Sequence, residues 1–260
     1  MEISRMKVNQ ISTLLASGNV SAEILASLRL DPRIAVTRLI EKYFRQQVVV
    51  EKEKARLEQL YEYEKSYYQQ GYHKVAGIDE AGRGPLAGPV VVAAVILPVN
   101  YFFPGLNDSK KLTAKQRENL FHEITENALA ISCVEVSVET IDTINIYQAT
   151  ISGMYQSLKE LALAPEAVLI DAVPLKELTI PNESLIKGDQ RSASIAAASI
   201  IAKVTRDRRM DELEGVYPHY GFSQHKGYGT KEHLAAIEKY GPCPAHRKTF
   251  SPINRWGGLL

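Results

Sequence analysis

The spacing of hydrophobic and polar residues along the chain changes near residue 72. Residues 1–70 hold a single glycine and a single proline, and their apolar positions recur at helical spacing among many charges. Ser21 predicts the N-cap of a short helix, and Asp31 followed by proline predicts the start of a long one. The helical pattern ends at a glycine, and we therefore expect an all-helical N-terminal extension over residues 1–71.

Beyond the extension, short apolar runs predict the strands of an α/β domain. Strands are predicted in VAGID, PVVVAAVILP, ISCVEVSV, AVLID and ELTIPNESLIKGD. Helices are predicted in TAKQRENLFHEITENA, which opens with a Thr113–Gln116 capping box, over residues 140–163, and from QRSASIAAASIIAKV onward. This order predicts a mixed sheet with helices packed on its faces. We expect the domain to cover residues 72–260 and to end in a helical C-terminal segment.

The composition is that of a soluble globular protein, with 45% hydrophobic and 23% charged residues. No apolar run approaches the roughly 20 residues that cross a bilayer, and the N-terminus lacks the apolar segment of a secretory signal. Cys133 and Cys243 lie far apart without metal-ligand spacing, so we expect reduced thiols. Together these features predict a cytoplasmic protein without membrane contact. Nothing in the sequence demands an oligomer, and we expect a monomer.

Charge is distributed unevenly along the chain. Lys and Arg exceed Asp and Glu by 2 over residues 1–70 and by 5 over residues 187–260, whereas acids are in excess by 6 over residues 71–186. An acidic centre beside a basic C-terminal third favours a protein that binds a polyanion, although solvated surface charge gives such numbers as well.

The segment GIDEAGRGPLAGPV, residues 77–90, combines an acid pair with glycines and prolines. Its glycine spacing formally matches a dinucleotide-binding fingerprint, but those glycines should open a helix, and here prolines lead into a strand. A plain turn explains the glycines and prolines. It does not explain two acids at the end of an apolar strand, because burying an unpaired carboxylate is costly. The segment therefore favours a cation site.

Acids follow other predicted strands as well. Asp79 and Glu80 end the first strand, Asp171 ends AVLID, and Asp189 follows LIKG. Carboxylates gathered at one edge of a sheet form an oxygen-rich site suited to Mg²⁺ or Mn²⁺. Two such ions about 4 Å apart can activate water and stabilise the leaving oxygen in phosphodiester cleavage. Since adjacent strand residues face opposite ways, we expect a turn beginning at Glu80 to bring its side chain round the strand end.

Five segments occur in one order along residues 72–255. They are IDEAGRGPLAGPVVVAAVIL, NDSKKLT, LIDA, IKGD followed by SIAAASIIAKVTRDR, and YGFSQHKGYGTKEH followed by HRKTF. Together they resemble bacterial ribonuclease HII, a type 2 ribonuclease H. The first 70 residues are similar to the helical extension of some ribonucleases HII from Gram-positive bacteria. Arg83 between two glycines favours this family over the related ribonucleases HIII, which carry a different residue there.

The resemblance implies a ribonuclease H-like α/β fold that binds two divalent ions, Mg²⁺ or Mn²⁺. By motif, the metal ligands and catalytic residues are Asp79, Glu80, Asp171 and Asp189. Asp207 is not among them, and we interpret it as a helix-surface residue paired with neighbouring arginines.

The resemblance also implies how the substrate is chosen. Gly82, Arg83 and Gly84 read the 2′-OH groups at an RNA–DNA junction, and Tyr228 stacks on the deoxyribose on the DNA side. Glycines suit this task, because the 2′-OH lies in a shallow minor groove that bare backbone can approach closely. The implied activity is cleavage of the RNA strand of RNA–DNA hybrids and incision 5′ of single ribonucleotides in duplex DNA. The products carry 3′-OH and 5′-phosphate ends.

Further residues are candidate substrate contacts, each with a structural alternative. They are Lys110 and Lys111 before a capped helix, Ser192 and Ser194 at a helix start, and Lys203 and Arg206 along that helix. The two lysines before the capped helix are either phosphate contacts or plain surface residues, and the serines form either an anion site or a packing contact. His225 and His246 lack metal-ligand spacing, and we interpret them as surface or structural residues.

Two rival functions stay open at this point. A ribonuclease HIII-like enzyme would cut hybrids and ignore single embedded ribonucleotides. A catalytically silent hybrid-binding protein would have lost a carboxylate, whereas all four are present. The helical extension could contact the duplex or bind a protein partner.

Overall fold

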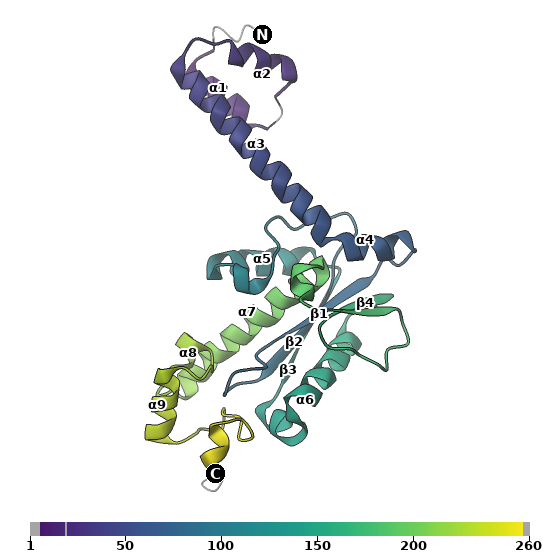
Figure 1. Cartoon of the computed structure of the whole chain (residues 1–260), viewed down its shortest axis with the longest axis vertical. Coiled ribbons are helices and arrows are strands. Elements are labelled where there is room, and N and C mark those ends of the chain that lie inside the picture. The colour runs from purple at the N-terminus through teal and green to yellow at the C-terminus, as the bar shows by residue number, and fades with distance from the viewer. Residues whose placement is uncertain (1–5, 19, 257–260) are drawn as a thin grey trace. The chain divides into compact units, whose positions relative to one another are not determined.

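The computed structural model describes residues 6–18 and 20–256, and its contacts divide the chain into two compact units. The first unit ends at Arg56 and the second begins at Leu57. The division falls within the long helix α3, Ile34–Leu60, which Figure 1 shows in blue-purple.

The first unit is helical over its described residues. It contains α1 (Val8–Ala16), α2 (Ala22–Arg29) and the N-terminal part of α3. Ser21 caps α2 as predicted, because its hydroxyl accepts a hydrogen bond from the Ile24 N–H at 3.3 Å. The helix α3 begins slightly later than predicted, since the Asp31 carboxylate accepts the Arg33 N–H in a local turn before the helix. The apolar faces of the helices meet in a small core of Ile11, Leu15, Leu28, Val36, Ile40 and Tyr43.

The second unit is built on a five-stranded mixed sheet with the order β3-β2-β1-β4-β5. The strands are β1 (Val75–Ala81), β2 (Val90–Ile96), β3 (Ala130–Val136), β4 (Ala167–Asp171) and β5 (Asn182–Leu185). β2 pairs antiparallel with β1 and β3, whereas β4 pairs parallel with β1 and β5. The predicted mixed α/β sheet is confirmed.

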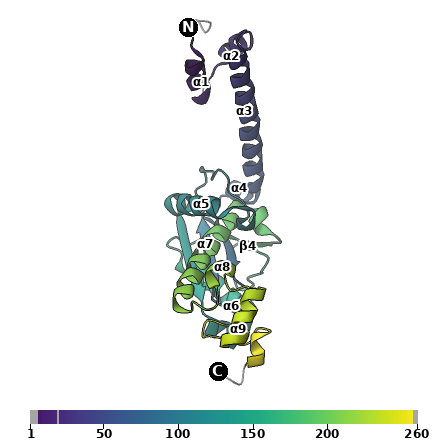
Figure 2. The same cartoon turned by 90° about the vertical axis from the view of Figure 1, so that its left-hand side faces the viewer.

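Helices cover both faces of the sheet, as Figures 1 and 2 show. The helices α5 (Ala114–Asn127) and α7 (Ala193–Val216) pack on one face, and α6 (Val138–Glu160) packs on the other. In β2, Val91 and Val95 face the α7 side, and Val92 and Ile96 face the α6 side. A strand that is buried on both faces needs apolar residues at every position, which explains the continuous run VVVAAVI.

The predicted capping box opens α5. The Thr113 hydroxyl accepts the Gln116 N–H, and the Gln116 side chain accepts the Thr113 N–H in return. The C-terminal segment is helical in part, as expected, with α8 (Phe222–His225), α9 (Lys231–Tyr240) and the 3₁₀ turn Ile253–Trp256.

Helix α4, Glu62–Gln69, belongs to the second compact unit, although the sequence pattern groups it with the extension. Its tyrosines pack against the apolar cluster of β1, β4 and β5. The Glu64 carboxylate is buried and accepts the Ser194 N–H at 2.9 Å at the start of α7. No helix in the described part of the chain is long and apolar enough to cross a membrane.

The packing of α7 on β1 depends on Gly77. A Cβ atom at this position would lie 2.0 Å from the Ser194 carbonyl carbon and 2.3 Å from the Ile195 nitrogen, both of them backbone atoms of α7. Because backbone cannot give way as a flexible side chain can, the helix would have to move away from the strand that carries Asp79.

We therefore predict that Gly77→Ala lowers the free energy of unfolding by about 3 kcal/mol or more. Urea denaturation measures the change. Gly215→Ala is the matched control in α7, where nothing lies within 4 Å of an added Cβ. The control should gain about 0.5–1 kcal/mol from the higher helix propensity of alanine. An equal response of the two variants would contradict the close packing described here.

Candidate active site

The C-terminal ends of β1 and β4 bring three carboxylates to one edge of the sheet. The two strands run parallel and pair side by side. Asp79 and Glu80 lie near the end of β1, and Asp171 is the last residue of β4. Parallel pairing thus places at one edge the acids that the sequence separates by about ninety positions.

The fourth carboxylate comes from the 3₁₀ turn η3, Gly188–Gln190, which follows β5. The Gly188 N–H donates to Asp171 Oδ1 at 2.6 Å. Lys187 has a φ of 56° in the left-handed region, which turns the chain sharply between β5 and η3. Asp189, one residue beyond Gly188, is thereby held beside Asp171.

The expected turn at Glu80 is wrong. β1 stays paired with β2 through Ala81, which lies opposite Val91, so the ladder continues past the acid pair. The Glu80 carboxylate reaches Arg83, whose Nη1 lies 3.2 Å from Glu80 Oε1. The glycine-rich loop begins only after Ala81.

Burial raises the pKa of all four carboxyl groups. The pKa of Asp79 is raised most clearly, first by burial and then by the negative charges of Glu80 and Asp171. For Glu80, burial raises the pKa and the nearby Arg83 guanidinium opposes the rise. The folded chain therefore holds these acids together against desolvation and mutual repulsion.

The donor set fits a divalent cation. Carboxylate oxygens are the ligands that Mg²⁺ and Mn²⁺ prefer, and Glu80 Oε2 is buried without a hydrogen-bond partner among the described residues. Nearby positive side chains neutralise part of the negative charge of these acids, since Lys110 Nζ lies 3.5 Å from Asp189 Oδ2. No three His, Cys, Asp or Glu side chains of the described ranges are already gathered as ligands of one ion. Glu80 faces Arg83 and Asp189 faces Lys110 instead.

A fifth acid, Asp108, lies beside the four carboxylates and was not predicted from the sequence. It is buried, and it caps the 3₁₀ turn η2, Ser109–Lys111, by accepting the Lys110 N–H at 2.8 Å. It also accepts the Gln190 side-chain amide at 3.1 Å, and its charge contributes to the raised pKa of Asp189. The cap explains why Lys110 faces the carboxylates. An acid directly before Ser-Lys-Lys was the signal in the sequence.

A cavity of about 370 Å³ joins the carboxylate edge to the glycine-rich loop. Its walls come from β1, the loop, η2, α7 and the segment after α8. The lining residues are Glu80, Ala81, Gly82, Arg83, Gly84, Ser109, Lys110, Ser199, Lys203, Arg206 and Tyr228. The structure thus brings one of the four predicted carboxylates together with the predicted loop, Tyr228 and two predicted lysines around a single space.

Residues 76–253 match the family described as Ribonuclease HII, and residues 7–68 match its N-terminal domain. The chain belongs to the ribonuclease HII family. The predicted resemblance and the predicted ribonuclease H-like fold are both confirmed. Members of this family are endonucleases of the ribonuclease H class, and the chain is an enzyme that acts on the RNA of RNA–DNA hybrids.

Individual proteins agree with the family match. A ribonuclease HII of Enterococcus faecalis is 53% identical over 241 residues, which cover 93% of this chain and 94% of that protein. One from Halalkalibacterium halodurans is 50% identical and covers 96% of this chain and 95% of that one. The crystal structure of the ribonuclease H2 from Pyrococcus horikoshii matches with a TM-score of 0.62 and 27% identity. It covers 72% of this chain and 98% of its own.

Ser192 and Ser194 do not form an open anion site. Both are buried, and Glu64 Oε1 accepts hydrogen bonds from both hydroxyls. The start of α7 does attract an anion, as a helix N-terminus should, but the anion is the chain's own carboxylate. We therefore leave these serines out of the proposed substrate contacts.

Along α7, Asp207 and Arg206 behave differently from the prediction. Asp207 pairs with Lys203, whose Nζ lies 2.6 Å from Asp207 Oδ1, rather than with the adjacent arginines. Arg206 is buried and donates to backbone carbonyl groups, so it cannot track a nucleic-acid backbone as expected. Lys203 lines the cavity.

A buried pair of histidines holds the segment that carries Tyr228. His233 Nε2 and His246 Nε2 are 3.0 Å apart, and the Cys243 N–H donates to His246 Nδ1 at 3.0 Å. His246 is thus the donor to His233, whose Nδ1 then donates to the Tyr228 carbonyl at 2.9 Å. His246 is structural, as expected, and neither ring can take a second proton without breaking the chain of hydrogen bonds.

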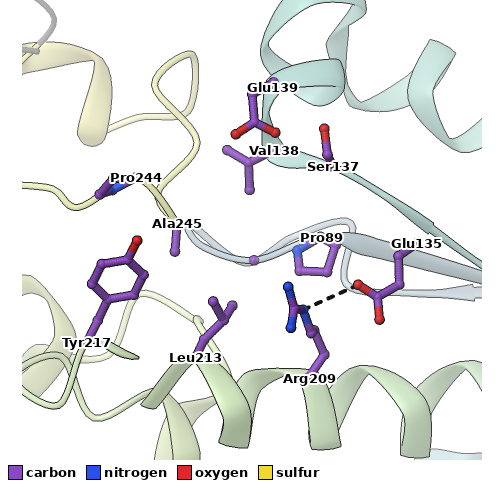
Figure 3. Close-up of a pocket in the computed structure, with 11 residues that line it drawn as sticks. Pro89, Glu135, Ser137, Val138, Glu139, Arg209, Leu213, Tyr217, Pro244 and Ala245 are labelled. Carbon is purple, nitrogen blue, oxygen red and sulfur yellow. Dashed lines mark ion pairs between the residues drawn. The ribbon is translucent and has the colours of Figure 1, made fainter. Parts of the chain in front are cut away.

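A second cavity, of about 280 Å³, lies against the end of the glycine-rich loop at Gly88 and Pro89. Figure 3 shows its lining, with Arg209 paired to Glu135 at 3.4 Å. None of the four carboxylates reaches this cavity, and its charged groups are already paired in part. The predicted site residues therefore point to the first cavity rather than to this one.

The histidine pair makes stability depend on pH. Burial lowers the pKa of His233 and His246 from 6.5 to about 4. Between these values the unfolded chain binds more protons than the folded one, so stability falls as pH falls from 6.5 toward 4. Each histidine contributes a slope of up to about 1.4 kcal/mol per pH unit.

We predict that His233→Phe reduces this slope by up to about 1.4 kcal/mol per pH unit, whatever its effect on absolute stability. Urea denaturation at several pH values between 6.5 and 4.5 measures it. His122→Phe, which removes an exposed histidine beside Glu118, is the control for the substitution itself. An unchanged slope in the His233 variant would show that this ring titrates normally.

Proposed function

We propose that this enzyme cuts the RNA strand of RNA–DNA hybrids and also incises 5′ of single ribonucleotides embedded in duplex DNA. The observation that carries the proposal is the shared cavity, in which Glu80 of the acid cluster, the Gly82–Gly84 loop and Tyr228 face one space. A cleavage centre and a sugar-reading surface within one cavity favour selection of a single ribose at the scissile position. Such an activity serves the removal of ribonucleotides from DNA during repair and replication.

The acids are proposed to hold two divalent cations, Mg²⁺ or Mn²⁺. Asp79, Glu80, Asp171 and Asp189 supply hard oxygen ligands, and the unpartnered Glu80 Oε2 supports this role. When bound, such ions lower the pKa of a water molecule and stabilise a departing oxygen. Lys110, beside Asp189, offsets negative charge at the same edge. The expected products carry 3′-OH and 5′-phosphate ends.

Positions 82 and 84 of the loop are glycine for different physical reasons. Gly82 has a φ of 95°, and a Cβ there would lie 1.9 Å from Arg206 Nε, so the fold itself requires glycine. At Gly84 the nearest atom to an added Cβ is Tyr228 Cε1, at 3.9 Å, and the chain would tolerate a side chain. Internal packing does not explain Gly84, and close approach of a nucleic-acid sugar does.

Tyr228 and the lysines complete the proposed contact surface. Tyr228 is 49% exposed and lines the cavity, so its ring is open to stack on a deoxyribose. Lys110 and Lys203 line the same cavity and are proposed to contact phosphates. We propose that the protein acts as a monomer in the cytoplasm.

A ribonuclease HIII-like activity, limited to long hybrids, is the second candidate. The Gly-Arg-Gly loop and the Tyr228 ring beside it favour incision at single ribonucleotides as well, because together they are placed to contact one ribose and the sugar that follows it. Activity on a duplex with a single ribonucleotide separates the two.

We predict incision of such a duplex in Mg²⁺ or Mn²⁺, measured by gel electrophoresis of an end-labelled strand. Asp79→Asn should lower the rate at least about a hundredfold, because it removes a ligand charge. Glu177→Gln, which removes an exposed carboxylate outside the acid cluster, should stay within about threefold of the wild-type protein, since surface substitutions away from the site change little. Wild-type protein that cuts long hybrids but leaves the single-ribonucleotide duplex intact would establish the second candidate instead.

A further inference from the structure

Two arginines lie buried beneath the glycine-rich loop. Arg206 and Arg247 are 1% and 0% exposed and rank among the largest fully buried side chains. Within the described residues neither forms an ion pair with a carboxylate. Burying an arginine without a carboxylate partner is costly unless its N–H groups form hydrogen bonds. The hydrogen-bond acceptors of Arg206 and Arg247 therefore show what the fold gains from these two side chains.

The partners of Arg247 are carbonyl groups of the loop itself. Its Nη1 donates to the Arg83 carbonyl at 2.8 Å and its Nη2 to the Gly82 carbonyl at 2.5 Å. Its Nε and Nη2 also donate to the Gly88 carbonyl, at 3.0 and 2.8 Å. One planar guanidinium thus holds both ends of the loop.

This grip fixes the direction of two N–H groups. The peptide bonds of the loop are trans, and in a trans peptide the C=O and N–H point opposite ways. Since the Gly82 and Arg83 carbonyls point down to Arg247, the N–H groups of Arg83 and Gly84 point away from it. Both residues line the cavity, and neither N–H donates to an acceptor in the described part of the chain. They are two free donors directed toward the substrate space.

Arg206 ties the loop to the segment of Tyr228. It donates to the carbonyls of Pro89 at 3.0 Å and Ala87 at 3.1 Å, and to the Lys226 carbonyl at 3.0 Å. The Leu86 N–H donates to the Gly227 carbonyl at 2.8 Å and strengthens the same junction. The loop and Tyr228 are therefore held as one unit.

The positive charges of Arg206 and Arg247 also favour an anionic substrate on the loop. Burial and the neighbouring Arg206 charge lower the pKa of Arg247 to about 9, and burial also lowers the pKa of Arg206. Arginine side chains in proteins stay protonated at neutral pH. Two positive charges without a carboxylate lie behind a loop that faces the cavity. An anionic backbone placed on that loop offsets their cost.

We propose that Arg247, supported by Arg206, is a positioning residue for ribose recognition, which aims the Arg83 and Gly84 N–H groups at the 2′-oxygen of the substrate. The inference rests on the proposed function, because it names what directs the loop that chooses the sugar. Arg247 acts through the loop and does not itself touch the substrate.

Arg247→Lys tests this inference, because lysine keeps the charge and loses the planar fork. The variant is made in an Asp79→Asn background, which should slow cleavage at least about a hundredfold, and binding is measured without added metal. Fluorescence anisotropy then gives the dissociation constants for a duplex with one ribonucleotide and for the all-DNA duplex of the same sequence. The ratio of the two should fall roughly three- to tenfold, the effect of one lost neutral hydrogen bond, while affinity for the all-DNA duplex stays within about twofold.

Arg209→Lys is the matched control, since Arg209 also contacts the region near Pro89 but pairs with the Glu135 and Glu212 carboxylates (Figure 3). It should leave both affinities unchanged. An unchanged ratio in the Arg247 variant, or an equal loss of both affinities, overturns the inference. Absence of any ribonucleotide preference in the Asp79→Asn parent would instead count against the proposed function.

A measurement on the parent protein decides the matter if Arg247→Lys does not fold. In NMR spectra of the Asp79→Asn protein, the Arg83 and Gly84 amide resonances should shift more with the single-ribonucleotide duplex than with the all-DNA duplex. Equal shifts with both duplexes would show that these N–H groups do not read the sugar.

Discussion

Mutual repulsion among buried carboxylates is the constraint on which the arrangement of the second unit depends. Asp79, Glu80 and Asp171 lie at one sheet edge, where burial raises the pKa of each and, for Asp79, the charges of Glu80 and Asp171 add to the rise. Specific backbone contacts hold the carboxylates in place against this repulsion and desolvation. Parallel pairing of β1 with β4 fixes the strand ends, the Gly188 N–H holds Asp171, and Gly77 lets α7 lie directly on β1. The fold bears this cost in stability at the edge where we propose that divalent cations bind.

The same strand that ends in the acids runs on into the loop that is proposed to choose the sugar. Beneath that loop the fold places two buried arginines, Arg206 and Arg247. Because the loop carbonyl groups point toward these arginines, the Arg83 and Gly84 N–H groups point away from them. The histidine pair and Arg206 hold the segment of Tyr228 beside the loop. An acidic edge and a basic support thus stand side by side in one cavity.

Local patterns predicted the elements well. The run VVVAAVI gave a strand buried on both faces, and the Thr113–Gln116 capping box began α5 where expected. Four acids after apolar runs indicated an acidic edge. What sequence reasoning missed depends on long-range contacts. Glu64 fills the start of α7 from 128 and 130 positions away, and Arg247 reaches the loop across 165 positions. Composition and periodicity carry no signal for such contacts, so the sequence left the serines open between an anion site and a packing contact and made Arg206 a candidate nucleic-acid contact.

Thermal unfolding of the wild-type protein and Asp79→Asn, with and without Mg²⁺ or Mn²⁺, tests the central claim most directly. Because the pKa of Asp79 is raised, this carboxyl group costs the wild-type protein stability as pH rises through that pKa, and the variant, which keeps only the other three acids, should lose less. Above it and without metal, the variant should be more stable by about 1–2 kcal/mol. Added metal should raise the melting temperature of the wild-type protein markedly and that of the variant much less. A variant that is less stable than the wild-type protein without metal, or equal metal responses of the two, would contradict the account.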